Sequence, residues 1–430
     1  MFWLFKGFFY VIGGAATLTA GLASYLAFLQ PPFYFPQPTG KYAVGTATYH
    51  FVDEHRKTVT QDSAPGKELM VQIWYPSSED KMTQKPTAPY APYYVDYFKR
   101  NQKMAWLLTM ARPMYTYATN NAPLIQNEQQ LPVIIFSHGL GCTRNTNTAH
   151  CEELASHGYI VVGINHSFGC TVTKFPDDRI VAANLEELQK GALDNPMQLF
   201  KMLNNNVELW IDDMQMVLDN LARITTEKSS FLYNRLDMNH IGMLGHSYGG
   251  ATAAQMCRRD PRIKAGVDMD GALLGPNRTE PLHKPFMFLL GQPITKEEMF
   301  KLMEQAGLKG EHTKEYAEAI YQSYLPAIDK LVQETNHDMY KLTIKGAEHL
   351  TFCDMAIIKE GCLLARPMQN LGAGKLNGYR VTEIINSYLL SFFDKYLKGV
   401  DSPLLDNEKS KYPEVEMVAK QDFNQLFETR

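Results

Sequence analysis

Residues 241–255 read IGMLGHSYGGATAAQ, and this stretch decides the fold of the chain. The apolar run Ile241–Leu244 predicts a buried strand, and the helix-forming residues Ala251–Gln255 predict a helix. Between them lies a G-x-S-x-G pattern centred on Ser247. In this strand–turn–helix context the glycines permit a tight turn that exposes the serine hydroxyl, which predicts a nucleophile. The alternative is a structural turn whose glycines only end the strand and let the helix pack closely.

Short apolar runs alternate with helical patterns on both sides of this stretch. Several runs are continuously apolar, as is typical of strands buried on both faces of a parallel sheet. Helical spacing recurs in Val207–Leu221 and in Val381–Leu397. The pattern predicts an α/β fold, with a mostly parallel central sheet and helices on both faces. The further strands are expected at Leu69–Tyr75, Val133–Phe136, Tyr159–Ile164, Ala265–Met269, Phe286–Leu290 and Lys341–Ile344.

Some segments do not follow the alternation of strands and helices. Two long stretches rich in Tyr, Met and Asn, Pro89–Gln130 and Thr171–Asn206, are expected to form lid-like insertions or binding loops. The catalytic domain is predicted to span residues 40–400. Residues 401–430 are polar and are predicted to form a peripheral tail.

A serine nucleophile needs a base, and that base needs an orienting carboxylate. In this architecture the chain order is serine, acid, histidine. His349 follows the predicted strand Lys341–Ile344 across a short turn, which places it at the carboxyl edge of the sheet. Asp270 ends the run Ala265–Met269 at the same edge. The sequence therefore predicts Ser247, Asp270 and His349 as the catalytic residues.

Other acids remain possible. Asp268 falls within the strand, where burial of an unpaired carboxylate would cost several kcal/mol. Many hydrolases of this architecture carry the acid after the next strand, where the chain offers Glu297 and Glu298 at the start of a predicted helix.

The developing oxyanion needs two backbone N–H donors. One belongs to Tyr248, the residue after the nucleophile. The other is expected from the loop His138-Gly139-Leu140-Gly141, which follows an early strand, and Leu140 is the predicted donor.

The amino terminus, residues 1–30, is apolar, and no charged residue occurs from Gly7 to Gly40. It is long enough to cross a hydrocarbon core, which takes about 20 helical residues. Lys6 precedes the span, so the positive-inside rule predicts a membrane anchor with the catalytic domain on the exported side. A cleaved signal peptide ending near Ala23, and a secreted protein, is the main alternative, and a buried core helix is a third. Residues 31–39 are predicted to form a proline-rich spacer.

Composition excludes some classes of protein and of site. The net charge of −4 gives no basic field for a nucleic acid. No metal-ligand spacing or phosphate-binding loop occurs, so we expect neither metal nor cofactor. The 21 Met, 22 Phe and 23 Tyr suit either a lipid-facing surface or a large core. Six cysteines are too few for a disulfide scaffold, although Cys142 with Cys151 and Cys353 with Cys362 could pair.

Several motifs together resemble the secreted, plasma-type platelet-activating-factor acetylhydrolase family of the α/β-hydrolase superfamily. They are FSHGLG at 136–141, LASHGYIV at 154–161, GHSYGGAT at 245–252 and the segment His349-x-x-Phe352-x-Asp354. The stretches GKYAVG at 40–45 and QIWYP at 72–76 are also similar to the family's opening strands. Asp270 follows Ser247 by 23 residues, which is the family's spacing. The segment at 165–168, NHSF, departs from the family's charged stretch.

The resemblance implies a calcium-independent serine esterase that removes short or oxidised sn-2 acyl chains from phospholipids. The expected partners are therefore a phospholipid or other ester and, through the anchor, a membrane. A general carboxylesterase, lipase or polyester hydrolase with the same catalytic residues is the second hypothesis. A non-catalytic binding protein that kept the fold is the third, and the complete set of catalytic residues argues against it.

Overall fold

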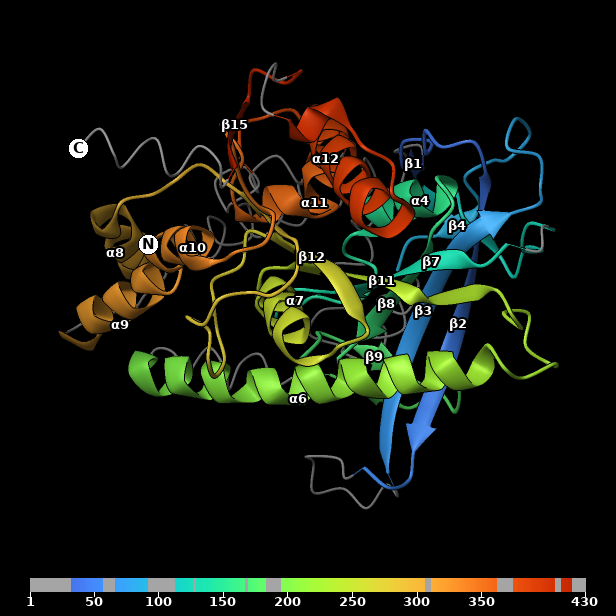
Figure 1. Ribbon diagram of the computed structural model, residues 1–430, viewed down its shortest axis with the longest axis horizontal. Helices are drawn as coiled ribbons and strands as arrows, with labels where there is room; N and C mark the ends of the chain where they lie inside the picture. The colour runs from blue at the N-terminus through green and yellow to red at the C-terminus, as the bar shows by residue number, and fades with distance from the viewer. Residues whose placement is uncertain are drawn as a thin grey trace, which may run out of the picture.

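A mixed sheet of ten strands lies at the centre of the described part of the protein (Figure 1). The computed structural model describes residues 32–56, 66–91, 113–126, 129–166, 169–182, 195–305, 311–361, 374–406 and 411–419. The strand order is β15-β14-β13-β12-β11-β7-β8-β3-β2-β6. From β14 to β8 the neighbouring strands are parallel, whereas β3 runs antiparallel to β8 and to β2.

All seven predicted strands are present, so the predicted α/β architecture is confirmed. Their apolar side chains are almost fully buried because both faces of the sheet are covered by helices. The ten strands of the central sheet, predicted or not, are β2 (Ala43–Asp53), β3 (Lys67–Ser77), β6 (Thr119–Asn120), β7 (Leu131–Ser137), β8 (Ile160–Asn165), β11 (Leu236–His246), β12 (Ile263–Met269), β13 (Phe286–Leu290), β14 (Met339–Ile344) and β15 (Val415–Ala419).

Helices cover the sheet on opposite sides, as Figure 1 shows for α6 and α12. One apolar core lies between the sheet and α6 (Pro196–Ile224), α7 (Tyr248–Arg259) and α10 (Leu325–Glu334). A second core lies between the other face and α4 (Thr148–Ser156) and α12 (Gly378–Lys398), with α11 (Met355–Gly361) packed on α12. The smaller helices α8 (Lys296–Gln305) and α9 (Glu311–Gln322) pack on each other beside α6.

Helix α6 confirms the predicted apolar stripe. Asn195 caps its first turn by accepting a hydrogen bond from the N–H of Gln198 at 3.0 Å. The side chains at helical spacing, among them Trp210, Met214 and Leu218, are buried against the sheet. The helix is 29 residues long and runs across the molecule in Figure 1.

Two segments are more integrated than the sequence predicts. In the expected spacer, Phe33 and Phe35 are buried, and β1 (Phe33–Tyr34) pairs with β5 (Met114–Thr116) in a small separate sheet with β4 (Ala88–Pro89). In the expected peripheral tail, β15 pairs with β14 and Tyr412 is fully buried. In both segments a few buried apolar side chains hold the chain against the domain, although prolines and charged residues surround them. The predicted bounds of the spacer and the tail stay predictions.

The insertions are described only in part. The first predicted lid, Pro89–Gln130, contributes β5 and β6, and its residues 92–112 and 127–128 lie outside the described residues. The second, Thr171–Asn206, contributes β9 (Thr173–Lys174), β10 (Ile180–Val181) and the first turns of α6, with 183–194 outside. Their role as lids therefore stays a prediction.

The amino-terminal anchor, residues 1–30, also lies outside the described residues. Within the part of the chain that the structure describes, no helix is both long and apolar enough to span a bilayer.

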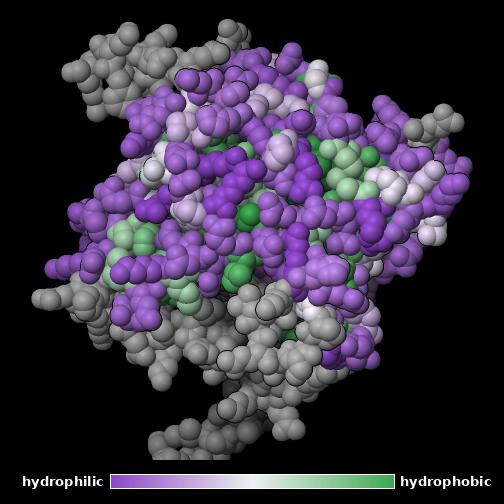
Figure 2. Space-filling view, turned by 60° about the horizontal axis from the view of Figure 1, so that its bottom comes forward, coloured by the Kyte–Doolittle hydropathy of each residue, from purple (hydrophilic) through white to green (hydrophobic). Residues whose placement is uncertain are grey.

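The aromatic and sulfur-containing residues serve mainly the core. The face in Figure 2 is largely hydrophilic, with small separate hydrophobic areas. Cys142 and Cys151 are free thiols and do not pair, and Cys362 lies outside the described residues. The large hydrophobic side chains exposed among the described residues are Tyr34, Val52, Met82, Leu140, Phe231, Tyr233, Tyr379 and Val400.

Candidate active site

The tight turn predicted around Ser247 is present between β11 and α7. Ser247 has φ 58° and ψ −120°, a left-handed conformation that non-glycine residues rarely adopt. The turn is too crowded for side chains on either side. A Cβ on Gly245 would lie 2.1 Å from the carbonyl oxygen of Gly249, and one on Gly249 would lie 2.1 Å from that of Ser137. The glycine pattern is thus a steric requirement of this turn.

The structure brings the three predicted catalytic side chains together. His349 Nε2 lies 2.9 Å from Ser247 Oγ, and His349 Nδ1 lies 2.7 Å from Asp270 Oδ2. Ser247 follows β11, Asp270 follows β12, and His349 begins the 3-10 helix η1 (His349–Phe352) beyond β14. These strands are parallel, so their carboxyl ends meet at one edge of the sheet. The distances and the order of contacts are those that a Ser–His–Asp catalytic triad requires.

Asp270 is held by more than His349. Its Oδ1 accepts hydrogen bonds from the Tyr324 hydroxyl at 2.5 Å and from the Gly291 N–H at 2.8 Å. Burial favours a higher pKa of Asp270, but the hydrogen bonds from His349, Gly291 and Tyr324 outweigh it and lower the pKa. The carboxylate is therefore charged at neutral pH and accepts from His349 Nδ1–H.

His349 is half exposed, so a substrate can reach it from solvent. Burial of part of the ring favours a lower pKa of His349, but the hydrogen bond and charge of Asp270 outweigh this and raise the pKa above 6.5. His246 supports the same loop, because its Nε2 lies 3.1 Å from the His349 carbonyl oxygen. Burial lowers the pKa of His246 to about 3, so its ring is neutral and donates this hydrogen bond.

The alternative acids lie elsewhere. Asp268 is fully buried within β12, and its Oδ1 accepts a hydrogen bond from the Gly271 N–H at 2.8 Å. Burial raises the pKa of Asp268 well above its ordinary value, which favours a neutral acid. Glu297 and Glu298 are exposed on α8, where Glu298 accepts from the N–H of Thr295 at 2.7 Å.

The predicted oxyanion donors lie on elements that flank Ser247. Tyr248 is the first residue of α7, so its N–H has no carbonyl partner within the helix. The loop after β7 passes directly beside the nucleophile, since a Cβ on Gly139 would lie 3.2 Å from Ser247 Cβ. Leu140, next in that loop, is 36% exposed.

Sequence reasoning missed Tyr324 as a partner of Asp270, the predicted catalytic acid. It lies 54 residues after Asp270, at the amino end of α10, and no motif surrounds it. Only the packing of α10 beside the carboxyl ends of the strands brings it to the site. Among the described residues, no group of three or more His, Cys, Asp or Glu side chains could hold a metal ion.

The chain is also similar to known proteins over most of its length. The family model described as platelet-activating factor acetylhydrolase, isoform II, matches residues 29–411. The platelet-activating factor acetylhydrolase of Canis lupus familiaris is 24% identical over 405 residues, covering 84% of this chain and 77% of the relative. A probable 1-alkyl-2-acetylglycerophosphocholine esterase of Arthroderma benhamiae is 23% identical over 407 residues, covering 89% and 93%.

A solved structure has the same fold. The ferulic acid esterase from Streptomyces cinnamoneus superposes with a TM-score of 0.64 and 27% identity, covering 90% of this chain and 99% of the esterase.

Proposed function

Because the chain belongs to the family of platelet-activating factor acetylhydrolase, isoform II, we propose that it is a calcium-independent serine hydrolase of phospholipid acyl esters. Its substrates are phospholipids with short or oxidised sn-2 chains. The observation that carries the proposal is the hydrogen-bonded series from Ser247 through His349 to Asp270. Relatives named as a platelet-activating factor acetylhydrolase and a probable 1-alkyl-2-acetylglycerophosphocholine esterase support this substrate class.

The reaction follows from the positions of the side chains. Because the Asp270 carboxylate accepts from Nδ1–H, His349 Nε2 is free to accept the proton of the Ser247 hydroxyl. The serine oxygen attacks the sn-2 carbonyl carbon, and His349 returns the proton to the leaving glycerol oxygen. Water then repeats the sequence on the acyl-enzyme with His349 again as base, which releases the fatty acid and restores Ser247.

The negative charge that develops on the carbonyl oxygen needs fixed donors. We assign the N–H groups of Leu140 and Tyr248 to this role, because one lies in the loop beside Ser247 and the other opens α7. Donors that are already oriented require no rearrangement as the charge forms, so they lower the energy of the transition state more than that of bound substrate.

We further assign residues 1–30 as an export segment, either a retained membrane anchor or a cleaved signal. Its uncharged apolar sequence supports this role. A tether beside a bilayer would raise the effective concentration of phospholipid at the site. Amino-terminal sequencing of the native protein separates the two forms, because an anchor starts at Met1 and a cleaved protein starts near Ser24.

A general carboxylesterase is the second candidate, and the structural similarity to a ferulic acid esterase favours it. The deciding experiment compares short-acyl phospholipid, long-acyl phospholipid and p-nitrophenyl esters, with Ser247→Ala as the control. We expect the highest kcat/KM on the short-acyl phospholipid, and we expect Ser247→Ala to lower turnover of every substrate by several orders of magnitude. Turnover of p-nitrophenyl esters alone would favour the carboxylesterase.

A further inference from the structure

A second Ser–His–Asp arrangement lies buried beneath the active site. His166 Nε2 lies 2.9 Å from Ser137 Oγ, and His166 Nδ1 lies 2.8 Å from Asp213 Oδ2. Ser137 and His166 are fully buried and Asp213 is 3% exposed, so no substrate reaches them. This group, which we call the buried triad, is therefore not a second catalytic centre.

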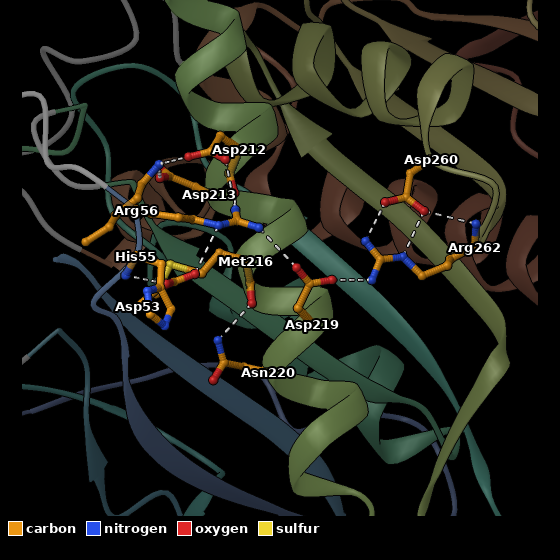
Figure 3. A network of polar contacts seen from close by, with 11 residues as sticks. Asp53, His55, Arg56, Asp212, Asp213, Met216, Asp219, Asn220, Asp260 and Arg262 are labelled. Atoms are coloured by element: carbon orange, nitrogen blue, oxygen red, sulfur yellow. Dashed lines mark hydrogen bonds and ion pairs between the residues drawn. The ribbon is translucent and has the colours of Figure 1, made fainter.

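The buried triad is anchored to an ion-pair network on α6. Lys67 Nζ lies 2.5 Å from Asp213 Oδ1 and 2.7 Å from Asp212 Oδ2. Figure 3 shows Asp212 and Asp219 facing Arg56, with Asp213 beside them. The ammonium of Lys67 compensates the buried carboxylate of Asp213. Because a carboxylate only accepts hydrogen bonds, Nδ1 of His166 carries the proton and Nε2 accepts from the Ser137 hydroxyl.

His166 also fixes the ring of His138 in the loop beside Ser247. The backbone N–H of His166 donates to His138 Nε2 at 3.3 Å, so Nε2 is unprotonated and Nδ1 carries the proton. His138 Nδ1–H then donates to the Gly139 carbonyl oxygen at 2.7 Å. The N–H of Cys142 donates to the same oxygen at 2.9 Å.

Fixing the Gly139 carbonyl fixes its neighbour's N–H. The peptide between Gly139 and Leu140 is planar and trans, as no cis bond occurs in the described chain. Its C=O and N–H groups therefore point in opposite directions. With the carbonyl bonded to His138 and Cys142, the N–H of Leu140 faces the other way.

Trp210 links the buried triad to the second oxyanion donor. Its ring stacks on His166 with centroids 3.9 Å apart and planes within 9°. It also meets the ring of Tyr248 edge to face, with centroids 4.7 Å apart. The hydroxyl of Tyr248 donates to the carbonyl oxygen of Leu203, also on α6, at 2.6 Å. Helix α6 thus contacts both His166 of the buried triad and Tyr248, the residue after the nucleophile.

We propose that His166 is a positioning residue for the oxyanion hole. Asp213 and Lys67 hold its side chain, its backbone N–H fixes the ring of His138, and that ring fixes the Gly139 carbonyl and with it the direction of the Leu140 N–H. This inference rests on the proposed function, because it acts through the donor role of Leu140. Burial lowers the pKa of both His166 and His138, which keeps their rings in the neutral forms that these hydrogen bonds require.

The test measures the contribution of the oxyanion hole directly. The variants are His166→Gln and Asp213→Asn, and the substrates are p-nitrophenyl acetate and its thionoester, whose C=S sulfur is a weak acceptor. We expect kcat on the oxygen ester to fall on the order of 10- to 100-fold with KM changed less than about twofold. The ratio of oxygen-ester to thionoester rates should fall as well, because only the oxygen ester loses a strong interaction.

The matched control is Asp219→Asn, which removes a charge from the same helix. Asp219 pairs with Arg56 at 3.0 Å and with Arg262 at 2.7 Å and does not belong to the buried triad. Its kinetics should match those of the unmodified protein. If Asp213→Asn fails to fold, the double variant Lys67→Met with Asp213→Asn removes the ion pair without leaving an uncompensated charge.

Two outcomes would overturn the inference. One is an unchanged kcat in folded variants, and the other is an equal loss on both substrates, which would indicate general disruption. If the unmodified protein hydrolyses neither of these esters nor a short-acyl phospholipid, the proposed function is wrong and the inference falls with it. Hydrolysis by the unmodified protein together with an unchanged rate ratio in the variants overturns the inference alone.

Discussion

The hydroxyl of Tyr324 donates a hydrogen bond to Oδ1 of Asp270 at 2.5 Å, while Nδ1 of His349 lies 2.7 Å from Oδ2 of the same carboxylate. The two oxygens of the predicted catalytic acid are thus held by residues from different parts of the chain, the N-cap of α10 and the start of η1. The plane of the carboxylate is fixed, and with it the orientation of the His349 ring.

Replacement of Tyr324 by Phe should therefore weaken both catalysis and stability. We expect kcat to fall several-fold to about tenfold, because Asp270 orients His349 less firmly. The free energy of unfolding at pH 7 should fall by about 1.5–3 kcal/mol, the range for a hydrogen bond to a charged group. Because the pKa of Asp270 is lower in the folded protein, its charge contributes stability that is fully present above the pKa of the unfolded state, about 3.9. This contribution disappears as pH falls below about 4 and through the folded pKa, so the loss of stability caused by Tyr324→Phe should shrink there.

Urea unfolding at pH 7 and at pH 3 measures the stability change. The matched control is Tyr321→Phe, one turn earlier on α9, which should alter neither quantity. An equal loss of stability at both pH values would contradict the link to the Asp270 charge.

Substitution of each triad residue should separate their roles. Ser247→Ala and His349→Ala should lower turnover by several orders of magnitude, and Asp270→Asn by roughly 10⁴-fold. The exposed Glu297 gives a control, because Glu297→Gln should retain full activity. Steady-state hydrolysis of a water-soluble ester measures all four, and loss of activity in Glu297→Gln with retention in Asp270→Asn would move the acid to α8.

The pH dependence of kcat/KM should report His349. Catalysis needs the neutral ring, and Asp270 raises the pKa of His349, so activity should be lost as pH falls through an apparent pKa above 6.5. Asp270→Asn removes the charge that stabilises the imidazolium, so the residual activity should titrate at lower pH. An acid limb unchanged by this substitution would show that another group titrates.

Removal of metals should leave the activity intact. Hydrolysis of p-nitrophenyl acetate in excess EDTA should equal that in added calcium, because the proposed oxyanion donors supply the electrostatic stabilisation. Loss in EDTA that calcium restores would contradict this mechanism.

The buried side chains of Phe33 and Phe35 set where the amino terminus can be removed. Deletion of residues 1–31 should leave the melting temperature and small-ester hydrolysis unchanged, while hydrolysis of phospholipid vesicles falls with loss of the tether. Deletion of residues 1–38 should lower the melting temperature, because Phe33 and Phe35 pack in a cluster with Ala149 and Ile357. Equal melting temperatures for the two deletions would show that this cluster contributes little.

Local sequence patterns carried most of what could be predicted. The tight turn around Ser247 requires the glycines two residues before and two residues after it, and both belong to a recognisable motif. Asp270 and His349 each follow a strand that the sequence predicts. Tyr324 and the contact between His166 and Asp213 could not be predicted, because they join residues 54 and 47 positions apart without a motif. Strand β15 was missed because an edge strand of five residues with a Glu at its second position carries little apolar signal.

That edge strand has a consequence for how the protein behaves in solution. Residues 415–419 occupy the backbone N–H and C=O groups along the outer side of β14, and the N–H of Lys345 extends the ladder to the Glu414 carbonyl. A chain cut before Glu414 would present β14 as an open edge whose residues Leu342 and Ile344 are apolar. Such an apolar edge is a template for strand exchange between molecules, whereas β15 ends the sheet with a strand that carries the exposed Glu416. The carboxyl-terminal segment therefore protects the enzyme against self-association.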